Sequence, residues 1–394
     1  MRSALNADVP LARAGEFAPL QIGALRLDPP VVLAPMAGVT NAPFRTLCRR
    51  FSGNRCLYVS EMIMAKAFAM GNAKTMRLAS FGPEESVRSI QLYGTEPVAL
   101  GEATRILRDE WDVQHIDMNF GCPVRKVTAA GGGAAIPARP RLLARLVRAV
   151  VQSAGDIPVT IKFRKGIDRE VLTFRDAGAV AEAEGCKAVA LHARTAAQLY
   201  AGEADWRAIT ELKQAVTTIP VLGNGDIYEG FDALRMMRET GCDGVVVGRG
   251  CLGRPWLFRD LCDVFDGREP QDPPDLRAIL AIVREHARLL ADWFGERPAM
   301  LQMRKFCGWY TKSFPGVKRA LPALQRVNTL AELDAELAKL PADQPFPAVA
   351  LRVRRGKDGH EQTVSLPEGF LADRNDDRAL FEDPDEAEEA WSGG

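Results

Sequence analysis

Short apolar runs recur along the first two thirds of the chain, and longer segments with helical spacing separate most of them. The runs are rich in Val, Ile and Leu, as in strands that are buried on both faces of a parallel sheet. They predict eight strands, at residues 31–36, 57–62, 87–93, 114–119, 158–163, 188–193, 220–225 and 244–249. Eight strands that alternate with helices favour a closed (β/α)₈ barrel over an open sheet.

The pattern changes after residue 255, where no further apolar run predicts a strand. Residues 275–294 have the spacing of one amphipathic helix, and residues 299–313 and 318–340 predict further helices, with a break at Pro315-Gly316. The expected fold class is α/β, a TIM barrel followed by a small all-α helical domain. We therefore predict four parts: an N-terminal lead-in over residues 1–26, a catalytic barrel over 27–260, a helical domain over 261–340 and a C-terminal extension over 341–394.

The C-terminal extension differs from the other parts in charge. The chain has 51 basic and 51 acidic residues, but residues 341–394 contain six Lys or Arg and thirteen Asp or Glu. The rest is therefore mildly basic, which permits a polyanionic partner without proving one. Residues 349–366 are typical of one hairpin that turns at Lys357-Asp358-Gly359. We expect the remainder of the extension to be mobile and the whole of it to be dispensable for chemistry.

Composition narrows the class of protein. The hydrophobic fraction of 47% is enough for a large buried core. The eight cysteines are scattered, without CxxC spacing or a Cys/His cluster, so neither a disulfide framework nor a metal site is expected. No apolar run reaches the roughly 18 residues that span a bilayer, and the N-terminus lacks a secretion signal. We expect a cytoplasmic protein with no membrane association, and no obligate protein partner is indicated.

Polar residues end nearly every predicted strand, and the carboxyl ends of barrel strands form the active-site face. Two glycine-rich turns, at residues 223–226 (GNGD) and 248–250 (GRG), follow the seventh and eighth strands. Glycines there let main-chain N–H groups approach an anion closely, and barrels often bind phosphate at this place. Arg249 can then form a charge-assisted hydrogen bond to the phosphate.

Four further residues at strand ends suggest chemistry. Lys162 lies within a strand, where a lysine needs an anionic partner. The amide of Gln91 can both donate and accept a hydrogen bond, and His192 can contact a ring or a phosphate. Cys122 lies in a Gly-Cys-Pro turn directly after the fourth strand. That place suits a thiol acid or nucleophile better than a structural cysteine.

Six spaced motifs resemble those of the tRNA-dihydrouridine synthase family, and the resemblance covers roughly residues 27–330. They are APMAGVTNAPFR (34–45), MNFGCPVRKVTAAGGGAAI (118–136), IKFRKG (161–166), LHARTAAQLYAGEADW (191–206), PVLGNGDI (220–227) and VVVGRGCLGRPW (245–256). Residues 303–316, MRKFCGWYTKSFPG, resemble the family's C-terminal RNA-binding domain. One departure is Phe306, which stands where the bacterial subgroup is expected to have histidine.

The resemblance implies an enzyme that reduces specific uridines of tRNA to 5,6-dihydrouridine. It implies FMN held without a covalent bond and reduced by NADPH, with Lys162 beside the reduced ring. The residues that it places in contact with FMN are Pro35, Met36, Ala37, Gln91, Lys162, His192, Asn224, Gly225, Asp226, Gly248 and Arg249.

In the implied reaction, hydride passes from N5 of reduced FMN to C6 of the uracil, and Cys122 donates a proton to C5. The target base must leave its stack to reach the cofactor, and Asn119 and Arg194 would contact it. The tRNA backbone would lie on basic residues of the helical domain: Arg304, Lys305, Lys312, Lys318 and Arg319.

Two other function classes stay open at this point. A small-molecule flavin barrel of the dihydroorotate dehydrogenase type also has phosphate-binding glycines and a lysine, but it needs no basic helical domain. A non-catalytic RNA-binding barrel would not need Cys122, Lys162 or the phosphate turns. The segment 303–316 argues against the first class, and the intact chemistry-bearing residues argue against the second.

Overall fold

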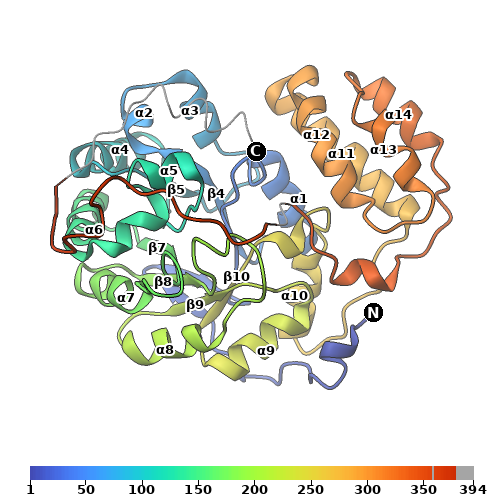
Figure 1. Ribbon diagram of the computed structural model, residues 1–394. Helices are drawn as coiled ribbons and strands as arrows, with labels where there is room; N and C mark the ends of the chain where they lie inside the picture. Colours follow the sequence, from blue (N-terminus) through green and yellow to red (C-terminus); the bar gives the residue numbers. More distant parts are fainter. Residues whose placement is uncertain (357–358, 379–394) are drawn as a thin grey trace.

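The computed structural model describes residues 1–356 and 359–378 and contains a closed barrel of eight parallel strands (Figure 1). All eight predicted strands are present, and each pairs with its neighbours along the chain, the last closing on the first. Their Val- and Ile-rich runs suit a sheet that is covered on both faces. The strands are β3 (Val31–Leu33), β4 (Leu57–Met64), β5 (Ser89–Tyr93), β6 (His115–Phe120), β7 (Val159–Arg164), β8 (Ala188–His192), β9 (Val221–Asn224) and β10 (Gly244–Val247).

Helices surround the barrel, as a (β/α)₈ fold requires. The first of them, α1, begins at an Asn41 cap, whose side chain accepts a hydrogen bond from the N–H of Phe44, and ends at the left-handed Gly53. The long outer helices are α1 (Ala42–Ser52), α4 (Pro97–Glu110), α6 (Pro140–Ala154), α7 (Phe174–Ala183), α8 (Arg207–Ala215), α9 (Gly230–Thr240) and α10 (Leu257–Phe265). Shorter turns of helix are α2 (Ala65–Ala69), α3 (Ala73–Ala79), α5 (Arg125–Ala129), and the 3₁₀ segments η1 (Ala4–Asn6), η2 (Gly133–Ala138) and η3 (Arg249–Cys251).

An N-terminal hairpin closes the amino end of the barrel. Strands β1 (Leu20–Ile22) and β2 (Leu25–Leu27) pair antiparallel, with Leu20 opposite Leu27. Their buried side chains join an apolar cluster with inward-facing residues of the barrel strands, among them Val32, Leu57 and Leu222. The predicted lead-in over residues 1–26 therefore contains a structural plug, and its boundary falls within β2.

The helical domain consists of α11 (Leu276–Phe294), α12 (Glu296–Tyr310), η4 (Val317–Arg319), α13 (Leu321–Leu324) and α14 (Leu330–Ala338). The predicted helix over residues 275–294 is present as α11. The predicted helix over 318–340 is divided, because Thr329 caps a new helix with its side chain. The proposed boundary at residue 260 cuts α10, whose buried face belongs to the barrel, so the helical domain begins at α11. This domain packs against α1 (Figure 1), with Phe44 and Phe306 stacked at a centroid distance of 6.0 Å.

The hairpin predicted over residues 349–366 is wrong. Ala348–Leu351 form a 3₁₀ segment, η5, and the described residues 352–356 and 359–366 contain no strand; residues 357–358 lie outside the described part. The charged side chains bind the body of the protein instead of facing one another across a hairpin. Arg352 pairs with Glu229 at 2.8 Å, and Arg355 donates to the carbonyl oxygen of Trp309 at 3.0 Å.

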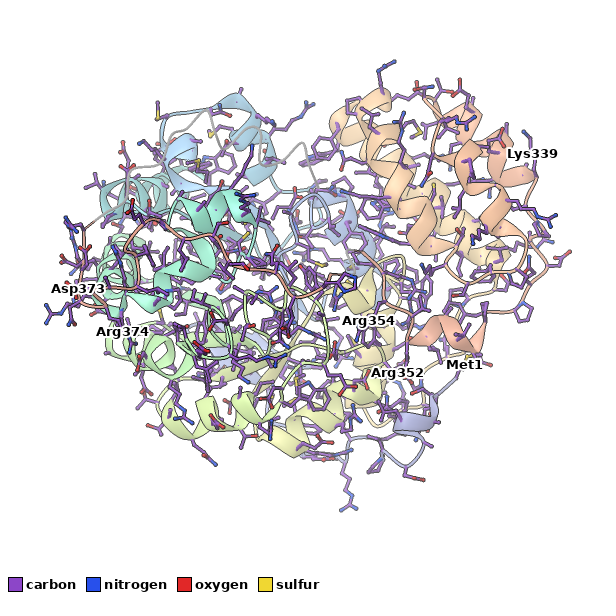
Figure 2. All side chains as sticks on the ribbon, in the orientation of Figure 1. Met1, Lys339, Arg352, Arg354, Asp373 and Arg374 are labelled. Atoms are coloured by element: carbon purple, nitrogen blue, oxygen red, sulfur yellow. The ribbon has the colours of Figure 1, made fainter. Side chains whose placement is uncertain are left out.

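The extension then continues across the barrel instead of hanging free. Figure 2 shows Arg352 and Arg374 on opposite sides of the barrel, and residues 359–378 pass over its face in Figure 1. Phe370 is 1% exposed, so the expectation of mobility does not hold for residues 367–378, and residues 379–394, to which it also applied, lie outside the described part. Over the described residues, no helix is both long and apolar enough to cross a membrane.

Candidate active site at the carboxyl rim of the barrel

The barrel brings the predicted rim residues together from consecutive strands. Asn119 of β6 is in register with Lys162 of β7, and His192 of β8 with Asn224 of β9. Gln91 of β5 is fully buried and opposes Asp117 of β6. Parallel strands of a closed barrel end at one rim, so sequence neighbours in this set are also neighbours in space.

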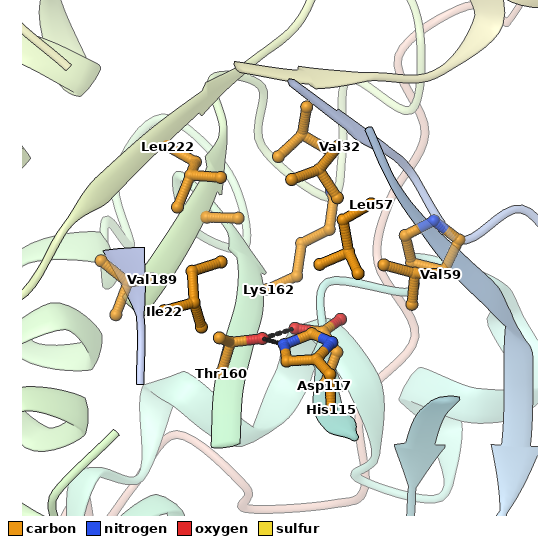
Figure 3. Close-up of a pocket in the computed structure, with 13 residues that line it drawn as sticks. Ile22, Val32, Leu57, Val59, His115, Asp117, Thr160, Lys162, Val189 and Leu222 are labelled. Atoms are coloured by element: carbon orange, nitrogen blue, oxygen red, sulfur yellow. Dashed lines mark hydrogen bonds between the residues drawn. The ribbon is translucent and has the colours of Figure 1, made fainter. Parts of the chain in front are cut away.

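A chain of buried hydrogen bonds runs through the barrel interior toward this rim (Figure 3). The hydroxyl of Thr160 lies 2.6 Å from Oδ1 of Asp117 and 3.0 Å from Nε2 of His115. A hydroxyl has one proton, which it donates to the carboxylate, so His115 must donate from Nε2. Burial lowers the pKa of His115 to about 3, consistent with this neutral form, and raises the pKa of Asp117 to about 6.

The same chain continues from Asp117 to the loop that carries Cys122. Nε2 of Gln91 donates to Asp117 at 2.6 Å, and Oε1 of Gln91 accepts from Nδ2 of Asn119 at 2.7 Å. Oδ1 of Asn119 accepts from the main-chain N–H of Cys122 at 2.9 Å. A main-chain N–H can only donate, so it fixes the orientation of both amides in turn. Cys122 is thus tied to a polar network that begins deep in the barrel.

The turn at Cys122 is closely packed from its other side. The N–H of Ala134 in η2 donates to the carbonyl oxygen of Cys122 at 3.0 Å. Gly133 has φ of +52°, and a methyl group on it would lie 2.6 Å from that oxygen, so only glycine fits. Of the eight cysteines, Cys122 alone is not buried. The predicted thiol is therefore the accessible one, and it lies on a loop of defined shape.

Cationic side chains surround His192 at the rim. Lys162, Arg164, Arg194 and Arg249 all act with burial to hold the pKa of His192 well below its usual range, burial being the larger cause. Burial also lowers the pKa of Lys162 to about 8. Four cations around a neutral imidazole form a site that favours an anionic ligand.

The turn after β9 has the shape of an anion cradle. Gly225 and Asp226 have φ of +132° and +58°, and a methyl group on Gly225 would lie 2.6 Å from Cβ of Ala204. Arg194, fully buried, donates to both carboxylate oxygens of Asp226 at 2.8 Å. Asp226 therefore orders the turn. An anion bound beside Gly225 would contact the other nitrogen of the Arg194 guanidinium, Nη1.

The turns after β3 and β10 lie next to each other. A methyl group on Gly248 would lie 3.7 Å from Cβ of Ala34 and 4.0 Å from the sulfur of Met36. Pro35 and Met36 are half-buried and Ala37 is exposed, so this turn forms an open edge of the rim. Asn224 donates from Nδ2 to the carbonyl oxygen of Val246 at 2.7 Å, which joins β9 to β10 beneath the two glycine turns.

The basic residues predicted on the helical domain fall into two groups. Lys312, Lys318 and Arg319 are exposed. Lys305 contacts the barrel instead: a methyl group on Gly38 would lie 2.9 Å from its Nζ, and its charge partly opposes the burial that raises the pKa of Glu61 to about 7.

The departure at residue 306 also has a structural reason. Phe306 is fully buried and stacks on Phe44 of α1, so it belongs to the packing between the helical domain and the barrel. Within the helical domain its ring centroid lies 4.4 Å from that of His286. Arg304, beside it, is half-buried, and its Nε has no hydrogen-bond partner among the described residues.

Sequence reasoning did not select Asp117 as a site residue, although the signal was present. In β6 the polar residues His115, Asp117 and Asn119 alternate with the apolar Ile116, Met118 and Phe120. Alternation with a period of two places the polar set on one face, here the barrel interior. Glu61 was read only as a polar strand end, and its burial depends on long-range packing that no local pattern reveals.

The described residues include no cluster of His, Cys, Asp or Glu that could hold a metal ion.

Comparison with known proteins identifies the family. The family model described as dihydrouridine synthase matches residues 32–344, which is most of the chain. The chain belongs to the dihydrouridine synthase family. A relative from Mycobacterium tuberculosis, a probable tRNA-dihydrouridine synthase, is 50% identical over 382 residues, covering 95% of this chain and 97% of the relative.

Other relatives align with a smaller part of this chain, although the alignment covers nearly their whole length. The tRNA-dihydrouridine synthase B of Pseudomonas aeruginosa is 37% identical, covering 82% of this chain and 94% of the relative. Among solved structures, histamine dehydrogenase from Rhizobium sp. 4-9 is 13% identical, with a TM-score of 0.48, covering 72% of this chain and 51% of that one. Family membership sets aside the dihydroorotate dehydrogenase class, and residues 345–394 lie beyond the family model.

Proposed function

We propose that this protein reduces uridine to 5,6-dihydrouridine in tRNA, with FMN as cofactor and NADPH as reductant. One observation carries the proposal: the accessible Cys122 shares a rim with the cations around His192, in a chain of the dihydrouridine synthase family. The names of the relatives supply the substrate class. The geometry supplies side chains that can act on it.

The rim residues fit a planar, anionic cofactor with a phosphate. Nη1 of Arg194 is buried without a hydrogen-bond partner among the residues described, and a methyl group on Gly225 would lie 3.8 Å from it. A buried donor without a partner is costly, and an anion at Gly225 would satisfy it. We assign the phosphate to the two glycine turns, with Asn224, Gly225 and Asp226 on one side and Gly248 and Arg249 on the other.

The ring system then falls to the residues between this cradle and the Cys122 loop, which are Pro35, Met36, Ala37, Gln91, Lys162 and His192. When bound and reduced by NADPH, FMN supplies the hydride that adds to C6 of the uracil. Lys162, with a pKa of about 8, is mostly protonated at neutral pH and favours negative charge beside it. His192 is neutral, so it can form a hydrogen bond without adding a charge.

Cys122 holds the proton that the reaction needs. Hydride addition at C6 leaves negative charge on C5 and the C4 oxygen of the base. The S–H bond of Cys122 breaks as a C5–H bond forms, and water then reprotonates the thiolate. A positioned general acid contributes about 10²–10⁴-fold. We propose that Asn119 and Arg194 contact the uracil. Asn119 lies beside the Cys122 loop, and Arg194 lies beside Gly225 in the turn after β9.

The helical domain is proposed to hold tRNA through its phosphates. Lys312, Lys318 and Arg319 are exposed, and phosphate contacts of this kind make binding weaken with salt. Lys305 contacts the barrel at Gly38, and Arg304 precedes it in α12; both are proposed to contact the tRNA near the base that must leave its stack. A tRNA substrate makes the cytoplasm the proposed location.

Anaerobic stopped-flow absorbance tests the assignment by following the two half-reactions separately. The purified protein should contain FMN, and Cys122→Ala should be reduced by NADPH at nearly the wild-type rate. Its reoxidation by tRNA should be at least about 10²-fold slower, whereas Cys307→Ala should reoxidise normally. Wild-type reoxidation in Cys122→Ala contradicts the acid, and a protein that retains no FMN favours the non-catalytic barrel.

A further inference from the structure

The described residues beyond the family model, 345–356 and 359–378, include side chains that are buried against the rest of the protein, among them Phe346, Leu351 and Phe370. We call residues 359–378 the C-terminal strap. In Figure 1 this segment crosses the face of the barrel and ends beside α6. The strap makes two sets of contacts with the segment that contains Cys122 and η2.

The first contact is made by Gln362. Its main-chain N–H donates to the carbonyl oxygen of Ala197 at 2.9 Å, and its Nε2 donates to the carbonyl oxygen of Pro123 at 3.4 Å. Pro123 directly follows Cys122, and Ala197 lies in the loop after β8. One strap residue therefore links the cysteine turn to a neighbouring rim loop.

The second contact is made by Phe370 and is stronger. Its ring is 1% exposed and packs in an apolar cluster with Ala135, Ala138 and Ile167. Arg139 lies with its guanidinium 4.0 Å from the ring centroid and donates from Nε to the carbonyl oxygen of Phe370 at 2.9 Å. Arg139 also pairs with Asp376 at 3.0 Å. Ala135, Ala138 and Arg139 belong to η2 and the residue that follows it, whereas Ile167 follows β7, so Phe370 packs between η2 and the loop after β7.

Anything that holds η2 also holds Cys122. The N–H of Ala134 in η2 donates to the carbonyl oxygen of Cys122, and Gly133 approaches that oxygen too closely to admit a side chain. A shift of η2 would therefore disturb the position of the Cys122 carbonyl group. A displacement of about 1 Å at a catalytic group can lower a rate by about 10²-fold.

We propose that the C-terminal strap is a positioning element for the Cys122 loop, with Phe370 and Gln362 as its positioning residues. This inference rests on the proposed function, in which Cys122 donates a proton to the substrate. The strap acts through η2 and Pro123, whereas Asn119 holds the N–H of Cys122. It thereby replaces the expectation, based on acidic composition, that the whole extension is dispensable.

The test uses the full-length holoenzyme with single substitutions. Phe370→Ala removes the buried ring, and Phe370→Leu keeps an apolar side chain. Gln362 is half-buried, and Gln362→Ala removes only the side-chain hydrogen bond to Pro123. This variant therefore remains informative if Phe370→Ala fails to fold. Arg374→Ala is the matched control, because Arg374 pairs with Asp176 of α7, away from the Cys122 loop.

Two readouts separate positioning from general stability. The first is the rate at which iodoacetamide alkylates Cys122, followed by mass spectrometry, since the other cysteines are buried. The second is the pair of half-reactions. Phe370→Ala should raise the alkylation rate severalfold and slow reoxidation by tRNA by roughly 10-fold, with reduction by NADPH and FMN content unchanged. Gln362→Ala should change both rates in the same direction to a smaller extent. Phe370→Leu should show alkylation and reoxidation rates close to those of wild type, and Arg374→Ala should resemble wild type.

The outcomes keep this proposal distinct from the proposed function. If Cys122→Ala reoxidises slowly but Phe370→Ala and Gln362→Ala leave alkylation and reoxidation unchanged, the strap proposal is overturned and the acid assignment stands. Equal slowing of both half-reactions in Phe370→Ala and Gln362→Ala also overturns it, since that indicates general damage. If Cys122→Ala itself reoxidises at the wild-type rate, the acid assignment fails, whatever the strap variants do.

Discussion

Nε2 of Gln91 donates a hydrogen bond to Oδ2 of Asp117 at 2.6 Å inside the barrel, where both side chains are almost completely buried. The carboxylate thereby sets the direction of the Gln91 amide, which in turn orients Asn119 and the N–H of Cys122. A group that the reaction does not touch thus determines how the rim amides face the ligand.

Replacing Asp117 by asparagine should disturb this order. The hydroxyl of Thr160 would keep an acceptor, so the new NH₂ group would face Nε2 of Gln91, donor against donor. We expect Asp117→Asn to lower the free energy of unfolding by about 1–3 kcal/mol, measured by urea denaturation. Asp109→Asn, an exposed change on α4, should have no comparable effect. Equal stability of the two variants would contradict the role of Asp117.

Arg249→Ala should weaken the retention of FMN. A charge-assisted hydrogen bond to the phosphate contributes about 1.5–3 kcal/mol, so the dissociation constant should rise roughly 10- to 150-fold. Fluorescence titration of the apoprotein with FMN measures this. Arg175→Ala, an exposed change on α7, is the control. Unchanged affinity for FMN in Arg249→Ala would contradict the assignment of the phosphate to the turn after β10.

Glu61 should make stability depend on pH. Burial raises its pKa from 4.5 to about 7, against the opposing charges of Arg45 and Lys305. The folded-state pKa is above the unfolded one, so the carboxyl stabilises the fold at low pH, and this contribution is lost as pH rises from about 5 through 7. Relative to Glu61→Gln, wild type should lose up to about 3 kcal/mol between pH 5 and 8.

Urea denaturation of wild type and Glu61→Gln at both pH values gives this difference directly. Glu102→Gln, an exposed change on α4, should run parallel to wild type. A difference between wild type and Glu61→Gln that stays constant, or changes in the opposite direction, would show that the carboxyl is not protonated in the folded state near neutral pH.

Gly133→Ala should be more costly than an ordinary change of a left-handed glycine. Gly53 has φ of +63° with nothing within 4 Å of an added methyl group, so Gly53→Ala should cost only the backbone term, about 1–2 kcal/mol. Gly133→Ala also forces a methyl group against the carbonyl oxygen of Cys122, and we expect about 2–5 kcal/mol. Thermal unfolding of both variants compares them, and equal losses would mean that the turn at Cys122 can relax.

The sequence by itself determined the barrel and which residues lie at the carboxyl ends of its strands. Val-rich runs of strand length cannot be exposed, and parallel strands in a closed barrel bring Gln91, Asn119, Lys162 and His192 to one edge whatever the loops do. Even Asp117 was accessible to this reasoning, because its alternation with Ile116 and Met118 is a local property of one strand.

Only the tertiary structure decided the places of Phe306 and the C-terminal strap. Phe306 is buried because two domains meet at α1, and Phe370 is buried by Arg139, 231 residues earlier in the chain. The local signals in the extension were a hairpin pattern over residues 349–366, which proved wrong, and a composition that favoured mobility for the rest. Its order comes from pairing isolated side chains with distant partners, and local sequence cannot report an interaction whose free energy depends on a remote surface.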